Sequence, residues 1–150
     1  KKIFNEKEER LTKNLSIIPL KVPHRDEYSE TVGFKIIGPN KSALFIPDID
    51  KWEKWDKSIK KLITQVDYAF LDGTFYDAQE INNRDISEIP HPFIIESLKL
   101  FEDLNKLNRN KIYFIHLNHT NPANNKKSKA YKLIISKGLN VAQEGSNFEL

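Results

Sequence analysis

The most constraining feature of this sequence is a set of four short apolar runs, each of which ends on a histidine or an aspartate. The runs IIPLKVPH, SALFIPD, YAFLDGTF and KIYFIHLNH carry His24, Asp48, Asp72, and the pair His116 and His119. Each run is typical of a buried strand. In a layered α/β protein, strand ends gather along one edge of the sheet, which is where ligand sites form. The pattern therefore predicts a site of histidine and aspartate side chains at one sheet edge.

The spacing of apolar residues predicts a single α/β unit in which helices pack on a sheet. Strands are expected at 15–22, 31–37, 42–47, 66–71, 111–117 and 139–142, of which the second and third form a hairpin. Helices are expected at 50–65, 92–107 and 128–137. Residues 1–14 fit either a frayed helical turn or an extended lead-in, and residues 76–90 fit a polar loop with a hint of helix near 78–81.

Two local signals refine this assignment. Pro19 indicates that the first strand is an edge strand or a bulged one. Asp50 and Glu53 have the spacing of a capping box at the start of the 50–65 helix. Trp52 and Trp55 lie on the apolar stripe of that helix, so they are expected in the core or in a lid rather than on a ligand platform.

Composition excludes several classes of protein and of site. The chain has 150 residues, no cysteine and a formal net charge of only +3. Nucleic acid is therefore an unlikely partner, and the basic cluster at 124–129 is interpreted as a solvated loop. Without thiolates, any metal must be held by histidine, aspartate and water. No apolar run approaches the roughly 18–20 residues that span a bilayer, and no signal peptide is evident, so no membrane association and a cytoplasmic location are expected.

The chain contains no methionine and opens at Lys1 inside a charged segment. A complete gene product normally begins with methionine. We therefore expect this chain to be a fragment of a longer protein.

The polar residues at the strand ends each admit two readings. His116 interrupts an apolar strand, so its imidazole requires a partner, either a hydrogen bond or a metal. Asp48 is either a cap for the following helix or a metal ligand. Asp72 presents the same choice, and Gly73 beside it gives the backbone freedom to turn. No two histidines have the i, i+4 spacing of a local zinc motif, so a metal site would be assembled from distant strand ends.

At this point the ordered segments resemble a known family. They are VPHRDEYSETVGFKI, ALFIPDID, DYAFLDGTF, HPFIIESLKLF, KIYFIHLNHTNPA and GLNVAQEG. Together they resemble the C-terminal half of the coenzyme PQQ synthesis protein B family, within the metallo-β-lactamase-fold superfamily, and also its phosphodiesterase branch, which includes phosphoribosyl cyclic phosphodiesterases and tRNase Z. The resemblance covers roughly residues 20–150, and DGTF and the HxNxTNP pattern at 116–122 are its most specific elements.

The resemblance implies an αβ/βα sandwich of two similar halves with a dinuclear metal site on one rim. Residues 1–150 would form the C-terminal portion of one such domain, an α/β half-sandwich with a mixed sheet flanked by helices. By position, His24 and His116 match metal-binding histidines, and Asp48 matches the aspartate that bridges the two metals. Members of the PQQ synthesis family often lack a carboxylate at that position, so Asp48 favours a metal-competent hydrolase.

The resemblance also implies catalytic residues. His91 and His119 fall where phosphodiesterase relatives place a proton donor or a substrate contact. Asp72 and Thr74 match the strand-end motif that orients such a group.

One departure from the superfamily pattern is large. The main motif, HxHxDH, supplies up to four metal ligands from the N-terminal half, and none of the four histidines here has that spacing. We therefore expect that half to be removed, disordered or on another chain. Three ligands are enough to hold a zinc ion with an open position.

The resulting expectation is a metal-dependent hydrolase that cleaves a phosphodiester or another small-molecule substrate with a metal-activated water. Zinc is the first choice of metal, with manganese or iron as alternatives. Two other functions remain open, namely an oxidative or accessory step in the biosynthesis of a PQQ-like quinone cofactor, and a catalytically incomplete fragment that serves as a binding or scaffold module. A homodimer, or pairing with the missing N-terminal half, is the expected assembly.

Overall fold

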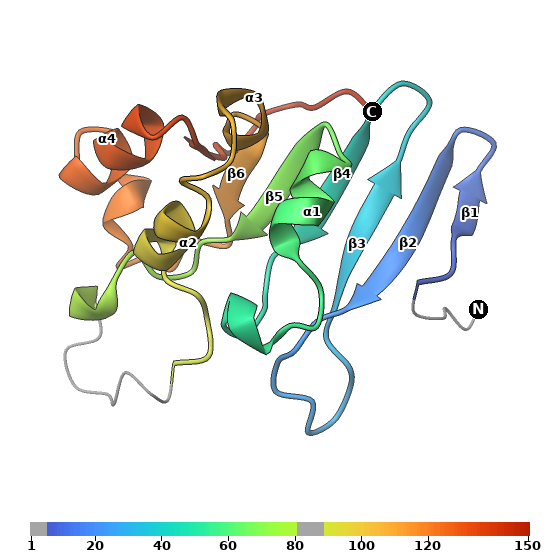
Figure 1. The fold of residues 1–150 in the computed structure, drawn as a ribbon, viewed down its shortest axis with the longest axis horizontal. Helices are drawn as coiled ribbons and strands as arrows, with labels where there is room; N and C mark the ends of the chain where they lie inside the picture. Colours follow the sequence, from blue (N-terminus) through green and yellow to red (C-terminus); the bar gives the residue numbers. More distant parts are fainter. Residues whose placement is uncertain (1–5, 81–88) are drawn as a thin grey trace.

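The computed structural model describes residues 6–80 and 89–150, and these residues form one mixed sheet with helices (Figure 1). Its strands are β1 (Glu9–Thr12), β2 (Leu15–Lys21), β3 (Val32–Ile37), β4 (Ser42–Ile46), β5 (Tyr68–Asp72), β6 (Ile112–Ile115) and β7 (Asn140–Val141). Its α-helices are α1 (Ile59–Thr64), α2 (Ile94–Leu100), α3 (Lys106–Arg109) and α4 (Lys129–Ser136). Short 3₁₀ turns are η1 (Trp52–Lys54), η2 (Ala78–Glu80) and η4 (Pro122–Asn124).

The strands lie in the sheet in the same order as in the chain. Strands β1 to β4 pair antiparallel, and the predicted hairpin is confirmed as β3 and β4. Strands β4 to β7 pair parallel, and each crossover between them contains helix. Consequently β2, β4, β5 and β6 all run in the same direction, and their carboxyl ends meet at one edge of the sheet (lower edge in Figure 1).

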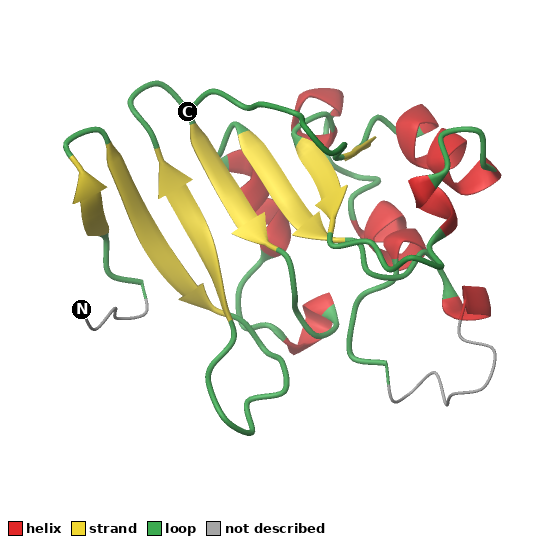
Figure 2. Ribbon diagram, turned by 180° about the vertical axis from the view of Figure 1, so that it is seen from behind, coloured by secondary structure: helices red, strands yellow, loops and turns green. Residues whose placement is uncertain are grey.

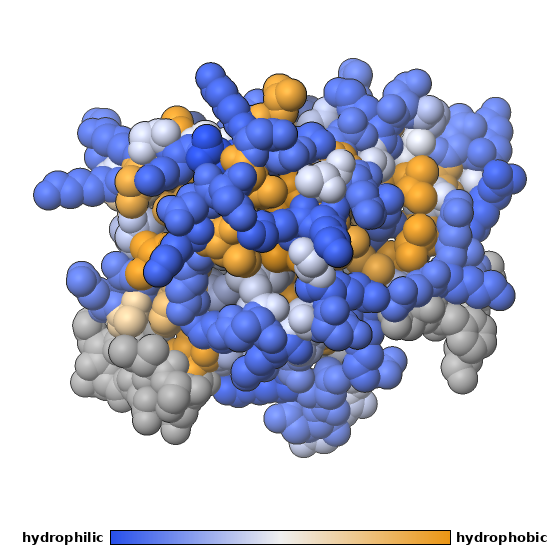
Figure 3. Space-filling view, in the orientation of Figure 1, coloured by the Kyte–Doolittle hydropathy of each residue, from blue (hydrophilic) through white to orange (hydrophobic). Residues whose placement is uncertain are grey.

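The hydrophobic core lies between the sheet and helices α1 and α2. Alternate strand residues point into it, including Leu44, Leu71 and Phe114, which have no exposed surface. They pack against helical residues such as Ile63 and Ile94, because each helix presents one apolar stripe to the sheet. The outer surface on this side is mostly hydrophilic, with apolar areas showing between the charged side chains (Figure 3).

The opposite face of the sheet carries no helix over its antiparallel half (Figure 2). Paired residues of neighbouring strands point to the same face, and one register row across five strands is almost entirely aromatic. This row is Pro19, Phe34, Phe45, Phe70 and Tyr113.

The C-terminal segment covers only part of this open face. The ring of Phe148 meets Phe70 and Tyr113 edge-on, at centroid distances of 4.8 and 4.9 Å. Phe45 remains 37% exposed. An aromatic row of this kind is unusual on a free surface. We call the side of the sheet that carries this row the open face.

The helix predicted at 50–65 is interrupted. Trp55 has extended backbone geometry, and α1 begins only after Ser58, whose hydroxyl accepts from the amide of Lys61. The two tryptophans are buried, as expected, but their indole N–H groups donate in different directions. Trp52 donates to Ser97 in α2 at 2.9 Å and Trp55 to the Lys21 carbonyl of β2 at 2.9 Å. A break in the helix allows both bonds to form.

The predicted capping box is also wrong. Lys51, not Asp50, is the N-cap of η1, and no side chain caps it. The helix predicted at 92–107 is likewise two helices, because Asn105 caps a separate α3 by accepting from the Asn108 amide.

Strand β1 appears where the sequence fitted a frayed helical turn or an extended lead-in, so β2 is not the edge strand that Pro19 indicated. Pro19 lies beyond the residues that β1 pairs, and β2 pairs with β3 there without a bulge. The helix predicted at 128–137 is present as α4, and Gly138, at φ +80°, follows its C-cap. Part of the 76–90 loop, residues 81–88, lies outside the described residues. Among the residues that are described, no helix has both the length and the apolar character to cross a bilayer.

Candidate functional site

Polar side chains from four strands meet at the carboxyl edge of the sheet. His24 lies just beyond β2, Asp48 just beyond β4, Asp72 ends β5, and His116 follows β6. His91 joins them from the segment that precedes α2. The parallel direction of these strands is the reason that residues far apart in sequence are neighbours here.

Asp72 is the buried centre of this group, with no exposed surface. Its Oδ1 accepts from the backbone N–H and the hydroxyl of Thr74, at 2.9 and 2.6 Å. Its Oδ2 accepts from the backbone N–H of Ile49 at 3.2 Å and lies 2.8 Å from Nδ1 of His91. Four donors around two oxygens stabilise a buried carboxylate. Asp72 therefore organises its neighbours and has no oxygen left unpaired.

Thr74 connects this carboxylate to His116. The threonine hydroxyl has one proton, which it donates to Asp72, so towards His116 it can only accept. His116 Nδ1 lies 3.0 Å from that hydroxyl oxygen and must carry the ring proton of the neutral imidazole. The Nε2 atom of His116 is then left with a free lone pair, which is the form that binds a metal.

The backbone supports this arrangement at two points. His116 has φ +60°, a left-handed conformation that is uncommon for a residue with a side chain and that turns the chain sharply out of β6. Gly73 donates to the Ile115 carbonyl at 2.9 Å, and a Cβ at position 73 would lie 2.9 Å from Cβ of Phe114. Only glycine allows β5 and β6 to end so close together.

His24 is held between two carboxylates. Its Nε2 lies 3.3 Å from Oδ2 of Asp48, and its Nδ1 lies 3.1 Å from Oδ1 of Asp50. Lys54 Nζ contacts the other oxygen of Asp50 at 3.0 Å. Burial by itself raises the pKa of Asp50, but hydrogen bonds and charge from Lys54 and His24 outweigh burial and lower that pKa below its usual value. Asp50 is therefore an ionised acceptor.

His91 lies in the middle of the group. Its ring centroid is 5.5 Å from that of His24 and 6.3 Å from that of His116. Burial alone lowers the pKa of His91, but the hydrogen bond that its ring donates to Asp72 and the negative charges of Asp72, Asp48 and Asp50 outweigh burial, so the pKa is raised. The protonated imidazolium of His91 is thus favoured by its surroundings.

Asp48 provides the observation that bears most directly on metal binding. Its Oδ1 atom is buried and has no hydrogen-bond partner among the described residues. One ligand atom each from Asp48, Asp72 and His91 lie within 4.8 Å of one another. Nδ1 of His91 is 3.5 Å from this oxygen, too far for a good hydrogen bond. A buried carboxylate oxygen without a hydrogen bond is costly, and a metal cation would satisfy it. The donor set of carboxylates and imidazoles, without thiolate, fits a divalent metal.

The structure brings together six of the seven residues expected at the site, which are His24, Asp48, Asp72, Thr74, His91 and His116. His119 is exposed, and its backbone N–H donates to the side chain of Asn118. No contact joins the imidazole of His119 to the group in the described part of the chain. Asp50 was missed as a site residue because its spacing suggested a helix cap.

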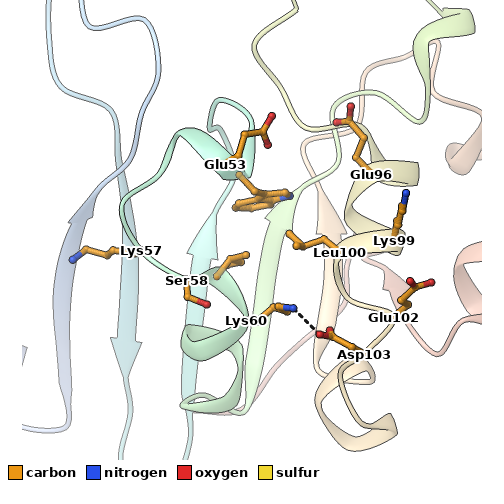
Figure 4. Close-up of a pocket in the computed structure, with 11 residues that line it drawn as sticks. Glu53, Lys57, Ser58, Lys60, Glu96, Lys99, Leu100, Glu102 and Asp103 are labelled. Carbon is orange, nitrogen blue, oxygen red and sulfur yellow. Dashed lines mark hydrogen bonds and ion pairs between the residues drawn. The ribbon is translucent and has the colours of Figure 1, made fainter.

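A separate groove of about 690 Å³ lies on the helix-covered face, between η1 and α1 on one side and α2 on the other (Figure 4). Charged side chains of both signs line it, and Lys60 and Asp103 form an ion pair at 2.7 Å across one end. None of the histidines lines it. The groove therefore takes no part in the chemistry of the sheet edge.

Comparison with known proteins identifies relatives of this chain. It is 26% identical over 154 aligned positions to coenzyme PQQ synthesis protein B of Acinetobacter baumannii strain ACICU, covering 91% of this chain and 50% of that protein. The corresponding protein of strain AYE is 25% identical with the same coverage. The chain thus spans about half the length of the curated relatives it matches.

A solved structure shows the same fold. Zn²⁺-bound PqqB from Methylobacterium extorquens superposes with a TM-score of 0.78 at 22% identity, over 99% of this chain and 51% of that one. This confirms the expected α/β half-sandwich with a mixed sheet. The family model described as the beta-lactamase superfamily domain matches residues 3–117, which is more than half of the sequence. The chain therefore belongs to the beta-lactamase superfamily.

Proposed function

We propose that this chain contributes the C-terminal half of a metal-dependent hydrolase site that cleaves a phosphodiester. The observation that carries the proposal is the buried Oδ1 of Asp48, which accepts no hydrogen bond among the described residues and has only a 3.5 Å contact with Nδ1 of His91. The zinc of the M. extorquens structure supports a divalent metal here, because that protein shares the fold. Zinc is our first choice, with manganese or iron as alternatives.

Asp48, His24 and His116 are the residues that would hold the metal. The free lone pair on Nε2 of His116 and the proximity of His24 Nε2 to Asp48 support this choice. Asp72 and His91, which form a 4.8 Å cluster with Asp48, are less suited to be ligands. The oxygens of Asp72 already accept four hydrogen bonds, and one of these comes from Nδ1 of His91. A bound divalent cation lowers the pKa of coordinated water and polarises a phosphoryl group.

His91 is the proposed proton donor. Its Nδ1 is engaged by Asp72, so the ring is fixed and Nε2 is the nitrogen that can give a proton to the leaving oxygen. The raised pKa of His91 favours the protonated form that a donor needs. This arrangement of a buried carboxylate behind a histidine orients the imidazole and stabilises its charge.

The open face supports the proposal that the domain is completed by a second half. An apolar row left on one side of a sheet is suited to packing against another sheet, and the relatives are about twice as long as this chain. A second copy of the chain is the alternative occupant. Intact-mass measurement of the protein from its natural source tests this, because a polypeptide carrying an HxHxDH motif should accompany residues 1–150 or be continuous with them.

Turnover of bis(p-nitrophenyl) phosphate with Zn²⁺ or Mn²⁺ tests the hydrolase. The complete protein should show activity, and both His116→Ala and His91→Ala should lower it by about 10²-fold or more. His119→Ala tests the choice between the two candidate proton donors. If His119→Ala loses activity and His91→Ala keeps it, His119 is the donor. No activity in the metal-loaded protein would refute the proposal.

The second candidate function is an oxidative or accessory step in the synthesis of a quinone cofactor. The relatives named coenzyme PQQ synthesis protein B favour it. Bound iron together with O₂ consumption would support this function, whereas bound zinc or manganese with phosphodiester turnover would exclude it. A protein that binds no metal, cleaves no phosphodiester and consumes no O₂ would instead be a binding or scaffold module.

A further inference from the structure

Asp50 has an arrangement of contacts that neither a cap nor a surface charge requires. Its side chain is only 15% exposed. One carboxylate oxygen faces Nδ1 of His24 at 3.1 Å and the other faces Nζ of Lys54 at 3.0 Å. Its backbone N–H donates to the carbonyl of Pro23 at 2.7 Å. The segment after β4 is therefore attached to the segment after β2 through both main chain and side chain, directly beside His24.

The chemistry of these contacts determines the state of the His24 ring. Both ring nitrogens face a carboxylate, but only the contact of Nδ1 with Asp50 is a hydrogen bond. An ionised carboxylate can only accept, so in a neutral ring, which has one proton, that proton is on the nitrogen bonded to Asp50. That nitrogen is Nδ1, and Nε2 is the atom turned towards Asp48, 3.3 Å from its Oδ2. The neutral ring then presents its lone pair to the position between the two residues. Carboxylates that hold ligating histidines in this way usually govern the tautomer and the orientation of the ring.

We propose that Asp50, held in turn by Lys54, is a positioning residue that fixes His24 as the Nδ1–H tautomer with Nε2 directed at the metal position. The proposal rests on the proposed metal site, and it assigns Asp50 a role through His24 without direct contact to metal or substrate. In this proposal the ammonium of Lys54 binds the second oxygen of Asp50 and so holds the carboxylate in place.

The test uses two variants and a matched control. Asp50→Ala removes the acceptor, and Asp50→Asn keeps the size of the side chain in case the alanine variant fails to fold. In Asp50→Asn the ammonium of Lys54 can only donate, so it takes the amide oxygen and leaves the amide NH₂ facing Nδ1 of His24. Asp56→Ala is the control, because Asp56 is exposed and makes no contact with His24 in the described structure.

Two measurements separate positioning from metal binding. Long-range ¹H–¹⁵N NMR of the metal-free protein at about pH 8.5, above the usual titration range of imidazole, reports the tautomer of His24. Competition with a chromophoric chelator gives the Zn²⁺ dissociation constant. We expect the Nδ1–H form in the wild type and in Asp56→Ala, a mixture of tautomers in Asp50→Ala, and the Nε2–H form in Asp50→Asn. Zinc affinity should fall by about 10–100-fold in both Asp50 variants and stay unchanged in the control.

An unaltered tautomer in both Asp50 variants would overturn the positioning role, whatever the zinc affinities. Wild-type zinc affinity in both variants would also overturn it. If no form of the protein binds zinc while His24 still changes tautomer as expected, the proposed metal site fails and the positioning of His24 by Asp50 stands.

Discussion

At the scale of single residues, Thr74 determines which nitrogen of His116 is available. Its hydroxyl joins the buried Asp72 carboxylate to Nδ1 of His116, at 2.6 and 3.0 Å. The threonine thus passes the orienting effect of a carboxylate to a histidine that the carboxylate does not contact. Asp50 has the same effect on His24 directly.

Thr74→Val should remove this link and leave His116 without a partner for Nδ1. We expect metal affinity to fall by about 10-fold or more, with both tautomers of His116 visible by ¹⁵N NMR. Thr74→Ser keeps the hydroxyl and serves as the control, so it should behave like the wild type. Equal zinc affinity in Thr74→Val and Thr74→Ser would contradict the assigned role.

The sequence allowed some site residues to be predicted and not others, for a physical reason. His24, Asp48, Asp72 and His116 end apolar strands, and the carboxyl ends of strands that run in the same direction share an edge whatever the loops do. Asp50 lies in a loop, and its function depends on where Pro23 and Lys54 lie in three dimensions. Lys54 is only four residues away in the sequence, but nothing near Asp50 in the sequence indicates that Pro23 and His24 lie beside it.

At the scale of secondary-structure elements, the two breaks in the predicted helices were invisible to periodicity. An apolar stripe of Trp52, Trp55 and Ile59 fits a continuous helix and an interrupted one equally well. Their hydrogen bonds decide the matter, because Trp52 is tied to α2 and Trp55 to β2. Strand β1 was not predicted because its residues are mostly polar and exposed, so they show no apolar alternation.

The bond from Trp52 to Ser97 should contribute measurably to stability. Ser97 is fully buried, so Trp52→Phe leaves its hydroxyl without a donor and should lower the free energy of unfolding by about 1–3 kcal/mol. Ser97→Ala and the double variant complete a double-mutant cycle. The cycle separates the energy of the Trp52–Ser97 bond from the effect of the different packing of Trp and Phe. Urea denaturation of the four proteins should give a coupling of about 1 kcal/mol, and additive effects would show that the bond contributes nothing.

Asp67, just before β5, ties the starts of two parallel strands together and gives a pH dependence. Its carboxylate accepts a hydrogen bond from the backbone N–H of Ser42 at 2.8 Å. This bond and the positive charges of Lys111 and Lys41 outweigh the effect of slight burial, so the pKa of Asp67 is lowered below its usual 3.8. The folded-state pKa is therefore below the unfolded one. Asp67 stabilises the fold above the unfolded pKa, and this contribution disappears as the pH falls through the folded value.

Asp67→Asn should accordingly be less stable than the wild type at neutral pH, and the two should converge in acid. Urea midpoints at about pH 7 and about pH 3 measure the difference. Asp56→Asn, in an exposed position without a partner in the described structure, should track the wild type at both pH values. A gap between Asp67→Asn and the wild type that is as wide in acid as at neutrality would argue against the bond.

At the scale of the whole molecule, the dominant feature is a sheet with helices on one side and an aromatic row on the other. The α/β class, the hairpin and the half-sandwich followed from the sequence and from the family resemblance. The sequence could not reveal the open face, because β4 is apolar on both of its faces and so has the pattern of a strand covered on both sides.

The open face should drive association of the isolated 150-residue chain. Phe45→Glu places a charge in the middle of the row and should weaken self-association, as measured by sedimentation equilibrium over a range of concentrations. Leu107→Glu is the control, because Leu107 is 78% exposed on α3, away from this face. A chain that is monomeric at all concentrations, or a control that dissociates as readily as Phe45→Glu, would show that the row is not a contact surface.

The unbroken correspondence between chain order and strand order has a consequence for biosynthesis. Each strand that leaves the ribosome pairs with the one made just before it, so the sheet can grow from one end during translation. Parallel strands normally delay folding because their partners are separated by long crossovers, and here only the last three pairings carry that delay. The histidine and aspartate residues at the sheet edge are therefore assembled in sequence, and the imidazole after β6 is the last of them to arrive.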